Sequence, residues 1–497
     1  MILDPYLLSF ILLFVAGLYL FGKLPSTDRL ALVLFKFNSH IGIKSMKQIG
    51  LRFKRFWNFI GNFALCVLFG AIGTAYVAHH VEEKYQRLIV AFMSFFFFQA
   101  LLFFTIHPVN YLRFIISALI ALSLYHFSAR LSKGQKTLLV FIFSAVFFSY
   151  PHLLPEPGIL NVLTALSIGI FGLPALIVVS LAINGIDIAT GTTNQPGINV
   201  GYPASENGEL GLKYSGTDVF LPLFPALVAL IILLFFHEGF HGLVASACNI
   251  KIKNTGLFSL SIIPLGAFVE PDEKDFKKKP KLSQMKVYAV GSFANIFVVA
   301  LACVIIAGIL TSTGAIETEG FVVGNVMNES PAAAVLKPGT IVYGVNDHKT
   351  DSFFDFLSFM SNTTAGQEIT LHTDAGPVIL TLTENPDSET GFAGIVRNFD
   401  PIMYTFAWQL STSNLKETEW LDFFHLLKWV FFINFMVGLF NLLPLKPLDG
   451  GYIYEEFIIW LSGIFGAKSH NIGEIIALIL FSLIFLIFLM NLAPYLF

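Results

Sequence analysis

Two histidines and a glutamate lie within one apolar stretch, in the segment FFHEGFHG over residues 235–242. His237 and His241 are four residues apart, so on a helix their side chains lie on the same face. That spacing allows both imidazoles to bind one zinc ion, and the neighbouring Glu238 can reach a metal-bound water without being a ligand. Zinc lowers the pKa of such a water to about 7, which produces a nucleophile at neutral pH. The pattern predicts metal-assisted hydrolysis.

The alternative is that two unrelated histidines occur in one helix. In a chain with 12 histidines, a chance HExxH has odds on the order of one in a hundred. Ionisable side chains are also costly inside apolar spans and are functional by default there. Both considerations favour a zinc site.

A catalytic zinc needs a third protein ligand and one open position. No histidine or glutamate follows on the same helix, and the candidate is Asp449 in NLLPLKPLDGG, residues 441–451. Pro444 and Pro447 cannot continue a helix cleanly, and irregular backbone at membrane depth is tolerated where it lines a watery cavity. The alternative is a helix end followed by an Asp–Gly turn. Paired with HExxH, the ligand interpretation is favoured.

Asn441 begins the same segment. Its amide could donate a hydrogen bond to the oxyanion of a tetrahedral intermediate. The alternative is a helix-capping asparagine, and spacing alone does not separate the two.

The elements that must position these residues are membrane spans. The 497-residue chain is 55% hydrophobic and only 13% charged, against about a quarter charged in soluble proteins. A net charge of −3 gives no basic bias that would indicate a nucleic-acid partner. Apolar runs of about twenty residues suffice to cross a bilayer. About ten are present, near 5–22, 58–79, 88–106, 110–128, 137–152, 160–184, 219–246, 285–311, 422–444 and 473–495.

Lysine and arginine predict the orientation of these spans. The basic loops 23–56 and 247–286 should both be cytoplasmic, and the six spans between them make that assignment self-consistent. Both termini, and the segment after the eighth span, are then extracytoplasmic. We expect a multi-pass protein of the cell membrane, in contact with the lipid bilayer.

Two polar segments interrupt the spans. Residues 185–218 are rich in Gly, Asn, Thr and Ser and predict an extracytoplasmic loop. Residues 316–400 show strand patterning around DSFFDFLSFMSN, whose apolar residues have helical spacing. The predicted fold class is an all-α polytopic membrane protein with an inserted small α+β module. The predicted organisation is a multi-span region (1–184), a loop (185–218), the first part of a membrane core (219–315), the module (316–400) and the second part of the core (401–497).

HEGFH in one span and NLLPLKPLDG at a later one resemble the site-2 protease family of intramembrane zinc metalloproteases. GSFANIFVV (291–299) is similar to the family's glycine- and asparagine-containing motif, with Ser292 where proline is usual. PLGAFVEPDE (264–273) resembles the strand-like segment after the first core span. The module 316–400 resembles a PDZ domain through NESPAAAVLKPGTIVYGVND, with Thr340 and Asp347 as departures. The resemblance is good over 219–497 and weak before it, where the extra spans are similar to those of archaeal multi-span members.

The resemblance implies one Zn²⁺ per chain held by His237, His241 and Asp449. It implies Glu238 as general base and then acid to the leaving amine, with Asn441 assisting at the oxyanion. Gly239 is expected to allow close backbone approach. Implied partners are membrane-anchored protein substrates, cut within or near their transmembrane helices, and a peptide ligand of the PDZ-like module.

Three other functions fit part of the pattern. A membrane zinc transporter would favour several metal sites along a path, whereas one compact site is evident. A prenyl-protein endopeptidase would take its third ligand from a glutamate on a later helix. A non-catalytic zinc-binding scaffold would not need the complete set His237, Glu238, His241 and Asp449.

Overall fold

A computed structural model represents the protein. The described residues are 15–19, 27–29, 33–103, 110–153, 159–206, 209–215, 220–261, 263–312, 320–323, 325–327, 330–337, 340–350, 353–384, 390–396, 421–464 and 470–495. They divide into two compact units, one formed by Met1–Val298 with Ile433–Phe497 and the other by Val299–Phe432. Each unit is described by itself.

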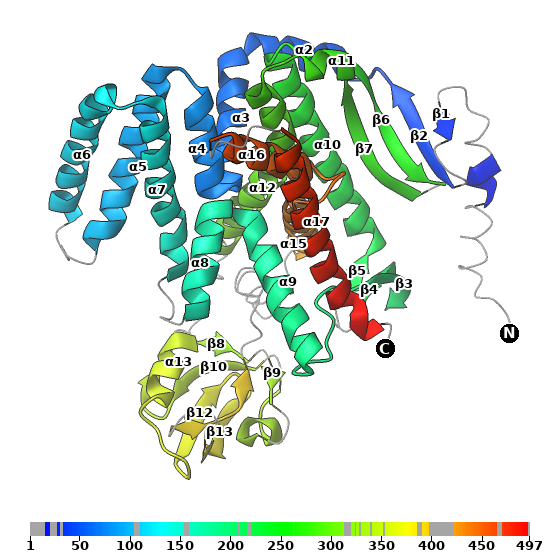
Figure 1. The fold of residues 1–497 in the computed structure, drawn as a ribbon. Coiled ribbons are helices and arrows are strands. Elements are labelled where there is room, and N and C mark those ends of the chain that lie inside the picture. The colour runs from blue at the N-terminus through cyan, green and yellow to red at the C-terminus, as the bar shows by residue number, and fades with distance from the viewer. Residues whose placement is uncertain are drawn as a thin grey trace. The chain divides into compact units, whose positions relative to one another are not determined.

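The first part of the first unit is a series of helices (Figure 1). Two glycines with positive φ break apolar runs that the sequence predicts as single spans, Gly70 with φ 56° and Gly172 with φ 79°. A left-handed backbone cannot continue a right-handed helix, and glycine adopts it without steric cost. The helices are α3 (Lys54–Leu68), α4 (Gly70–His80), α5 (Glu83–Phe103), α6 (Asn110–Phe127), α7 (Lys133–Leu153), α8 (Ile159–Phe171) and α9 (Leu173–Thr190).

The expectation of about ten spans is not confirmed. Within the described ranges, six helices are long and apolar enough to cross a membrane, and two shorter apolar helices accompany them. The breaks at Gly70 and Gly172 account for part of the difference, because they divide the predicted spans 58–79 and 160–184. The predicted span 5–22 lies largely outside the described residues. The six are Glu83–Leu102, Leu112–Arg130, Leu173–Thr190, Leu223–Ala247, Lys281–Ile306 and Gly473–Tyr495.

The helices of the predicted membrane core are α10 (Leu223–Ala247), α12 (Lys281–Ser312), α15 (Leu421–Phe440), α16 (Asp449–Ile464) and α17 (His470–Leu492). Two of them, α10 and α16, carry predicted site residues. A buried apolar cluster joins α3, α4, α12 and α16, with Tyr76, Met285 and Phe457 almost completely buried. The N-terminal helices therefore pack directly on the helix that begins with Asp449.

Two sheets of this unit correct the expectation that the membrane region is all helical. One is a four-stranded antiparallel sheet in the order β1-β2-β6-β7, built from β1 (Thr27–Arg29), β2 (Leu34–Ser39), β6 (Ile252–Leu260) and β7 (Ile263–Pro271). The other is a sheet of β3 (Gly201–Glu206), β4 (Glu209–Tyr214) and β5 (Phe220–Pro222), within the predicted loop 185–218 and just after it. Main-chain hydrogen bonding satisfies polar backbone groups that a loop would leave exposed near the membrane.

Short helices connect these elements. α2 (Ile43–Arg52) lies between β2 and α3, and α11 (Glu273–Lys277) lies between β7 and α12. The side chain of Asp272 caps α11 by accepting a hydrogen bond from the N–H of Asp275.

The second unit contains a small module of strands and one helix, α13 (Phe353–Met360). Its main sheet has the order β11-β10-β12-β13, and β8 also pairs with β10. Apolar residues of α13 and the sheet form a closed core, including Phe356, Ile369 and Leu371. The strands are β8 (Phe321–Val322), β9 (Asn325–Val326), β10 (Ile341–Val345), β11 (His348–Lys349), β12 (Glu368–Thr373), β13 (Gly376–Thr381), β14 (Thr383–Glu384), β15 (Gly391–Phe392) and β16 (Ile395–Val396).

Candidate metal centre

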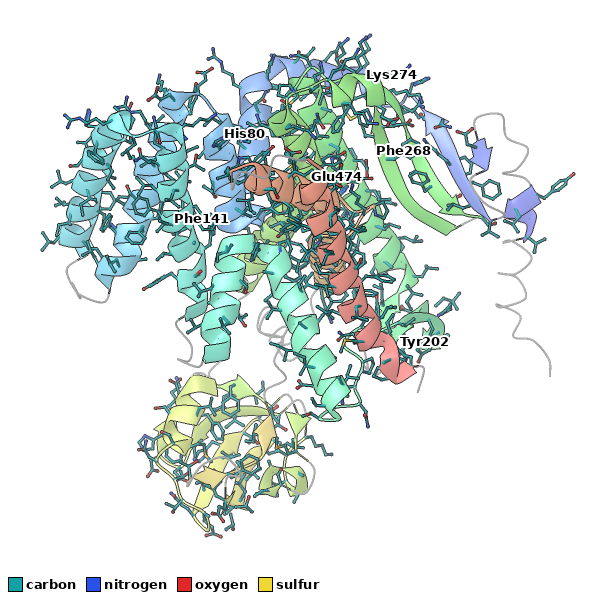
Figure 2. The ribbon with its side chains drawn as sticks, in the orientation of Figure 1. His80, Phe141, Tyr202, Phe268, Lys274 and Glu474 are labelled. Carbon is teal, nitrogen blue, oxygen red and sulfur yellow. The ribbon has the colours of Figure 1, made fainter. Side chains whose placement is uncertain are left out.

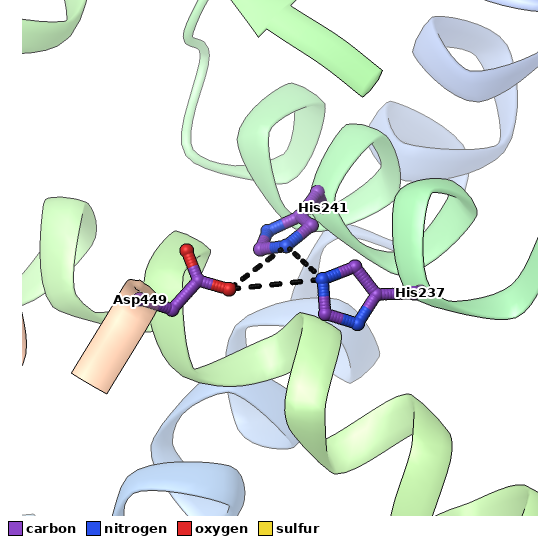
Figure 3. Close-up of side chains that lie close together, drawn as sticks. All are labelled: His237, His241 and Asp449. Atoms are coloured by element: carbon purple, nitrogen blue, oxygen red, sulfur yellow. Dashed lines mark hydrogen bonds and ion pairs between the residues drawn. The ribbon is translucent and has the colours of Figure 1, made fainter. Parts of the chain in front are cut away.

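Three predicted ligands meet in the first unit. Figure 3 shows His237 and His241 on neighbouring turns of α10, with the carboxylate of Asp449 facing both imidazoles. The two Nε2 atoms are 3.2 Å apart. Asp449 Oδ2 lies 3.4 Å from His241 Nε2 and 3.7 Å from His237 Nε2. Helical spacing aligns the histidines, but only the tertiary fold brings the carboxylate at the start of α16 to them.

The triangle formed by these three atoms has the size that a tetrahedral metal ion requires. Ligand distances of about 2.0–2.2 Å from a tetrahedral ion place neighbouring ligand atoms about 3.3–3.6 Å apart. The observed separations of 3.2, 3.4 and 3.7 Å match that spacing. Two imidazoles and one carboxylate form a donor set typical of catalytic zinc. The group could therefore hold a metal ion without rearrangement.

The remaining ring nitrogens of both histidines have partners on α12. His241 Nδ1 lies 2.6 Å from the carbonyl oxygen of Val287, and this contact places the proton on Nδ1 and leaves the Nε2 lone pair for a metal. His237 Nδ1 lies 3.1 Å from the fully buried amide of Asn295. A half turn of that amide would place Asn295 Oδ1, which has no partner among the described residues, where it accepts the His237 Nδ1 proton.

Gly291 on α12 leaves the space in which a metal ion would lie. A Cβ atom at this position would come within 2.2 Å of His241 Nε2 and 2.7 Å of His237 Nε2. Any larger residue would collide with the metal-facing nitrogens. Gly239 was expected to have such a role, and the structure corrects this, because a Cβ there would meet no described atom within 4 Å outside its own helix backbone.

Glu238 points to the sheet instead of joining the ligand triangle. Its Oε2 accepts a hydrogen bond from the backbone N–H of Val269 on β7, at 2.7 Å. Because β7 pairs with β6 on its other side, this N–H projects from the free edge of the sheet. The strand thus fixes the carboxylate beside the two histidines.

Asp449 is the first residue of α16, after the non-helical stretch 441–448 that the prolines predict. The N–H of Gly450 donates to the carbonyl oxygen of Asn441, at 2.8 Å, which ties the end of α15 to the start of α16. A Cβ at Gly450 would lie 2.1 Å from the carbonyl oxygen of Leu442, so the close approach requires glycine. No contact of the Asn441 side chain with the ligand triangle appears among the described residues, and its predicted oxyanion role stays a prediction.

A cavity of about 440 Å³ opens beside the three ligands. Tyr288 forms part of its wall, and its ring stacks on Tyr452 of α16 with centroids 4.9 Å apart. Sequence reasoning missed Tyr288 and Val287, which lie outside every quoted motif, and it gave no role to Val269, although Val269 lies in the quoted segment PLGAFVEPDE. Asn295 and Gly291 lie within the quoted GSFANIFVV motif. The lining residues are His237, Glu238, His241, Ala245, Val269, Glu270, Pro271, Glu273, Phe276, Val287, Tyr288 and Asp449.

Lysines of the sheet neutralise an acidic side chain that lines the cavity. Glu270 of β7 accepts a hydrogen bond from Lys36 of β2, at 2.7 Å, and Lys253 of β6 lies 3.3 Å from it. The Lys36 ammonium also lies over the ring of Phe268, 4.6 Å from the centroid; Figure 2 labels Phe268 on the hairpin. The Lys36 hydrogen bond lowers the pKa of Glu270 below its ordinary value of 4.5. This pair reaches across β6 and connects the inner strand β2 to β7, the strand beside Glu238.

The sequence over residues 225–487, just over half of the chain, matches the family model described as peptidase family M50. The chain belongs to peptidase family M50, the site-2 protease family. The match includes the three predicted ligands, His237, His241 and Asp449, and also Glu238. Together with the six apolar helices, it identifies a multi-pass membrane protein.

A similar curated protein comes from Methanocaldococcus jannaschii and is described as uncharacterized. It is 28% identical over 258 residues, which cover 52% of this M50 chain and 64% of that protein. The chain thus spans just under two thirds of the length of this relative. The predicted resemblance to site-2 proteases and to archaeal members is confirmed.

Proposed function

We propose that this M50 chain is an intramembrane zinc endopeptidase that hydrolyses a peptide bond within or near the transmembrane helix of a membrane-anchored protein. The observation that carries the proposal is the triangle of His237, His241 and Asp449 with Glu238 beside it. Two imidazoles and a carboxylate leave a fourth tetrahedral position for water or substrate. Bound zinc would supply Lewis-acid activation of that water and of the scissile carbonyl.

Residues of the chain would transfer the proton and orient the groups that take part in the reaction. Glu238 accepts a proton from the attacking water as its oxygen bonds to the carbonyl carbon, and delivers it to the amide nitrogen as the C–N bond breaks. The Val269 N–H holds one Glu238 oxygen and leaves the other for this transfer. Val287 and Asn295 keep the imidazoles in the orientation that a ligand needs. Asn441 remains our candidate for the oxyanion.

Substrate access rests on the free edge of β7. Val269 donates outward from this edge, and by alternation along the strand the N–H and C=O of Ala267 face the same way. An unwound substrate segment could therefore pair with β7 through Ala267, as an added strand next to the ligand triangle, while the Val269 N–H stays on Glu238. Prior unwinding is needed because carbonyl groups in an intact helix are hydrogen-bonded and shielded.

The proposal also covers the role of the module at 316–400 and the side of the membrane on which it lies. We infer that the module is PDZ-like and binds a peptide or filters substrates by size. It lies outside the membrane on the extracytoplasmic side, as do both termini, because the basic loops 23–56 and 247–286, with six predicted spans between them, favour the cytoplasm.

The decisive experiment compares zinc content and proteolysis in three purified proteins: wild type, Asp449→Ala and Glu238→Gln. We expect about one zinc ion per wild-type chain, loss of zinc in Asp449→Ala, and full zinc without proteolysis in Glu238→Gln. Proteolysis is read from a panel of tagged single-span reporters reconstituted with the enzyme.

Other outcomes favour the rival functions. Zinc retained in Asp449→Ala would mean that a glutamate or another side chain is the third ligand. Zinc flux into sealed vesicles that survives in Glu238→Gln would indicate a transporter. Zinc binding with no reporter cut by the wild type, while a matched M50 peptidase cuts the same panel, would indicate a scaffold.

A further inference from the structure

An amphipathic helix with uncompensated positive charge packs against the helix that carries the histidines. α2 has ten residues and would span about 15 Å, which is half of a bilayer core. It is therefore too short to cross the membrane. The surface of α2 that does not face the protein must contact something other than the interior of the bilayer.

One face of α2 packs against α10. Gly50 of α2 is buried, and a Cβ there would lie 2.6 Å from the carbonyl oxygen of Leu243. A Cβ at Gly242, next to His241, would lie 2.1 Å from the sulfur of Met46. α2 thus contacts the turn of α10 that presents a metal ligand. It is also tied to the sheet, since the hydroxyl of Thr255 on β6 donates to the carbonyl oxygen of Ile41, at 2.9 Å.

The opposite face of α2 is basic. With 100° per residue, Lys44 and Arg52 each lie about 140° from the side formed by Met46 and Gly50, and Lys47 lies on the flank, about 80° from that side. Residues 43–55 contain no acidic side chain. All five cations of this segment are exposed and have no ion pair among the described residues; they are Lys44, Lys47, Arg52, Lys54 and Arg55.

Several basic residues elsewhere in the same unit are neutralised by acids. Lys277 pairs with Glu273 and Lys279 with Asp275. Lys281 pairs with Glu456. Residues 43–55 differ from these segments because their cations have no acidic partner among the described residues. An anion from outside the chain could therefore neutralise them.

Large apolar side chains are exposed beside these cations. Ile41 is 84% exposed, and Phe53 and Phe56 are each more than half exposed. Ile41 and Phe53 flank α2, and Phe56 lies in the first turn of α3. Basic residues combined with exposed apolar residues on and around a short helix are the pattern of a segment that lies in the headgroup region of a membrane. Lysine and arginine clusters next to a span attract anionic lipids.

We propose that α2 and the first turn of α3 form a binding surface for anionic phospholipid headgroups, and that lipid bound there stabilises the contact between α2 and the metal-carrying turn of α10. Headgroup phosphates would neutralise the five cations, while Ile41, Phe53 and Phe56 enter the acyl boundary. The proposal does not depend on proteolysis.

The test is amide hydrogen exchange of the full chain in nanodiscs of phosphatidylcholine, with or without phosphatidylglycerol. We expect phosphatidylglycerol to slow exchange in residues 43–56 by about tenfold, because several cations each gain from an anionic surface. Added sodium chloride should remove the effect in phosphatidylglycerol discs and change little in phosphatidylcholine discs.

Two charge-matched variants locate the effect. Lys44→Gln/Lys47→Gln/Arg52→Gln should lose the protection, whereas Lys274→Gln/Lys277→Gln/Lys278→Gln, on and beside α11, should keep it; Figure 2 labels Lys274. Equal exchange in both lipids, an equal loss in both variants, or the same protection from inorganic phosphate added to phosphatidylcholine discs would each overturn the proposal. If the first variant does not fold, the salt dependence of the wild type decides.

Discussion

The backbone N–H of Val269 on β7 donates to Oε2 of Glu238 on α10, with 2.7 Å between the two atoms. A strand outside the helical bundle therefore orients the side chain that we assign as the general base. The contact links the sheet β1-β2-β6-β7 to the chemistry. It also makes a backbone group, which no sequence motif identifies, a positioning element of the site.

Substitution Val269→Pro tests this contact. Proline has no N–H, and a free strand edge tolerates it without loss of a ladder hydrogen bond. We expect reporter cleavage to fall by about tenfold, as for loss of a hydrogen bond to a charged group, with zinc content unchanged. Val269→Ala keeps the N–H and should retain most of the activity. Equal activity in both variants would mean that the Val269 hydrogen bond does not orient the base.

Substitution Gly291→Ala should prevent metal binding. The new methyl group would overlap the position next to His241 Nε2 and His237 Nε2. Zinc measured by elemental analysis should drop well below that of the wild type. Gly239→Ala is the matched control, because its methyl group meets no described atom outside its own helix; both changes raise helix propensity equally. A Gly291→Ala protein with full zinc would show that the ligand triangle relaxes around the methyl group.

Asn295 should tune zinc affinity through His237. Replacement by leucine, of similar size, removes the partner of His237 Nδ1, and we expect the dissociation constant for zinc to rise about 10–100-fold. Asn295→Asp keeps an acceptor for that nitrogen and should retain zinc. Competition with a chelator gives both constants. Equal constants for the two variants would assign Asn295 to packing alone.

The Lys36–Glu270 pair should stabilise the sheet in a pH-dependent way. The pKa of Glu270 is lowered in the folded chain, so the stabilisation is fully present above the unfolded value of about 4.5 and is lost as the pH falls through the lower folded value. Because both side chains are partly exposed, the effect is on the order of 1 kcal/mol or less.

The measurement is the midpoint of thermal unfolding in detergent for wild type and Lys36→Met. The wild type should be more stable at neutral pH, and the difference should shrink as the pH falls below about 4.5. Lys47→Met, which removes an unpaired cation, is the control and should show no such convergence. A difference that is constant with pH would mean that Lys36 acts through its contact with Phe268.

The sequence alone predicted most of the ligand set, because the relevant information is local. Four-residue spacing on a helix aligns His237 with His241 whatever the rest of the fold does. Prolines predicted the non-helical stretch before Asp449. The resemblance to site-2 proteases joined Asp449 to the histidines, and the ligand triangle agrees with it.

Tertiary structure decided what local patterns do not encode. Hydropathy cannot show that Gly70 and Gly172 adopt left-handed backbone and divide two predicted spans. Period-two patterning did not reveal the sheet joining β2 to β6 and β7, since β2 lies more than two hundred residues before its partner β6. Spacing fixes positions within one element, whereas distances between elements are set by packing. The separation of Asp449 from His241, and the hydrogen bond from Val269 to Glu238, therefore exist only once α10, α12, α16 and β7 have packed together.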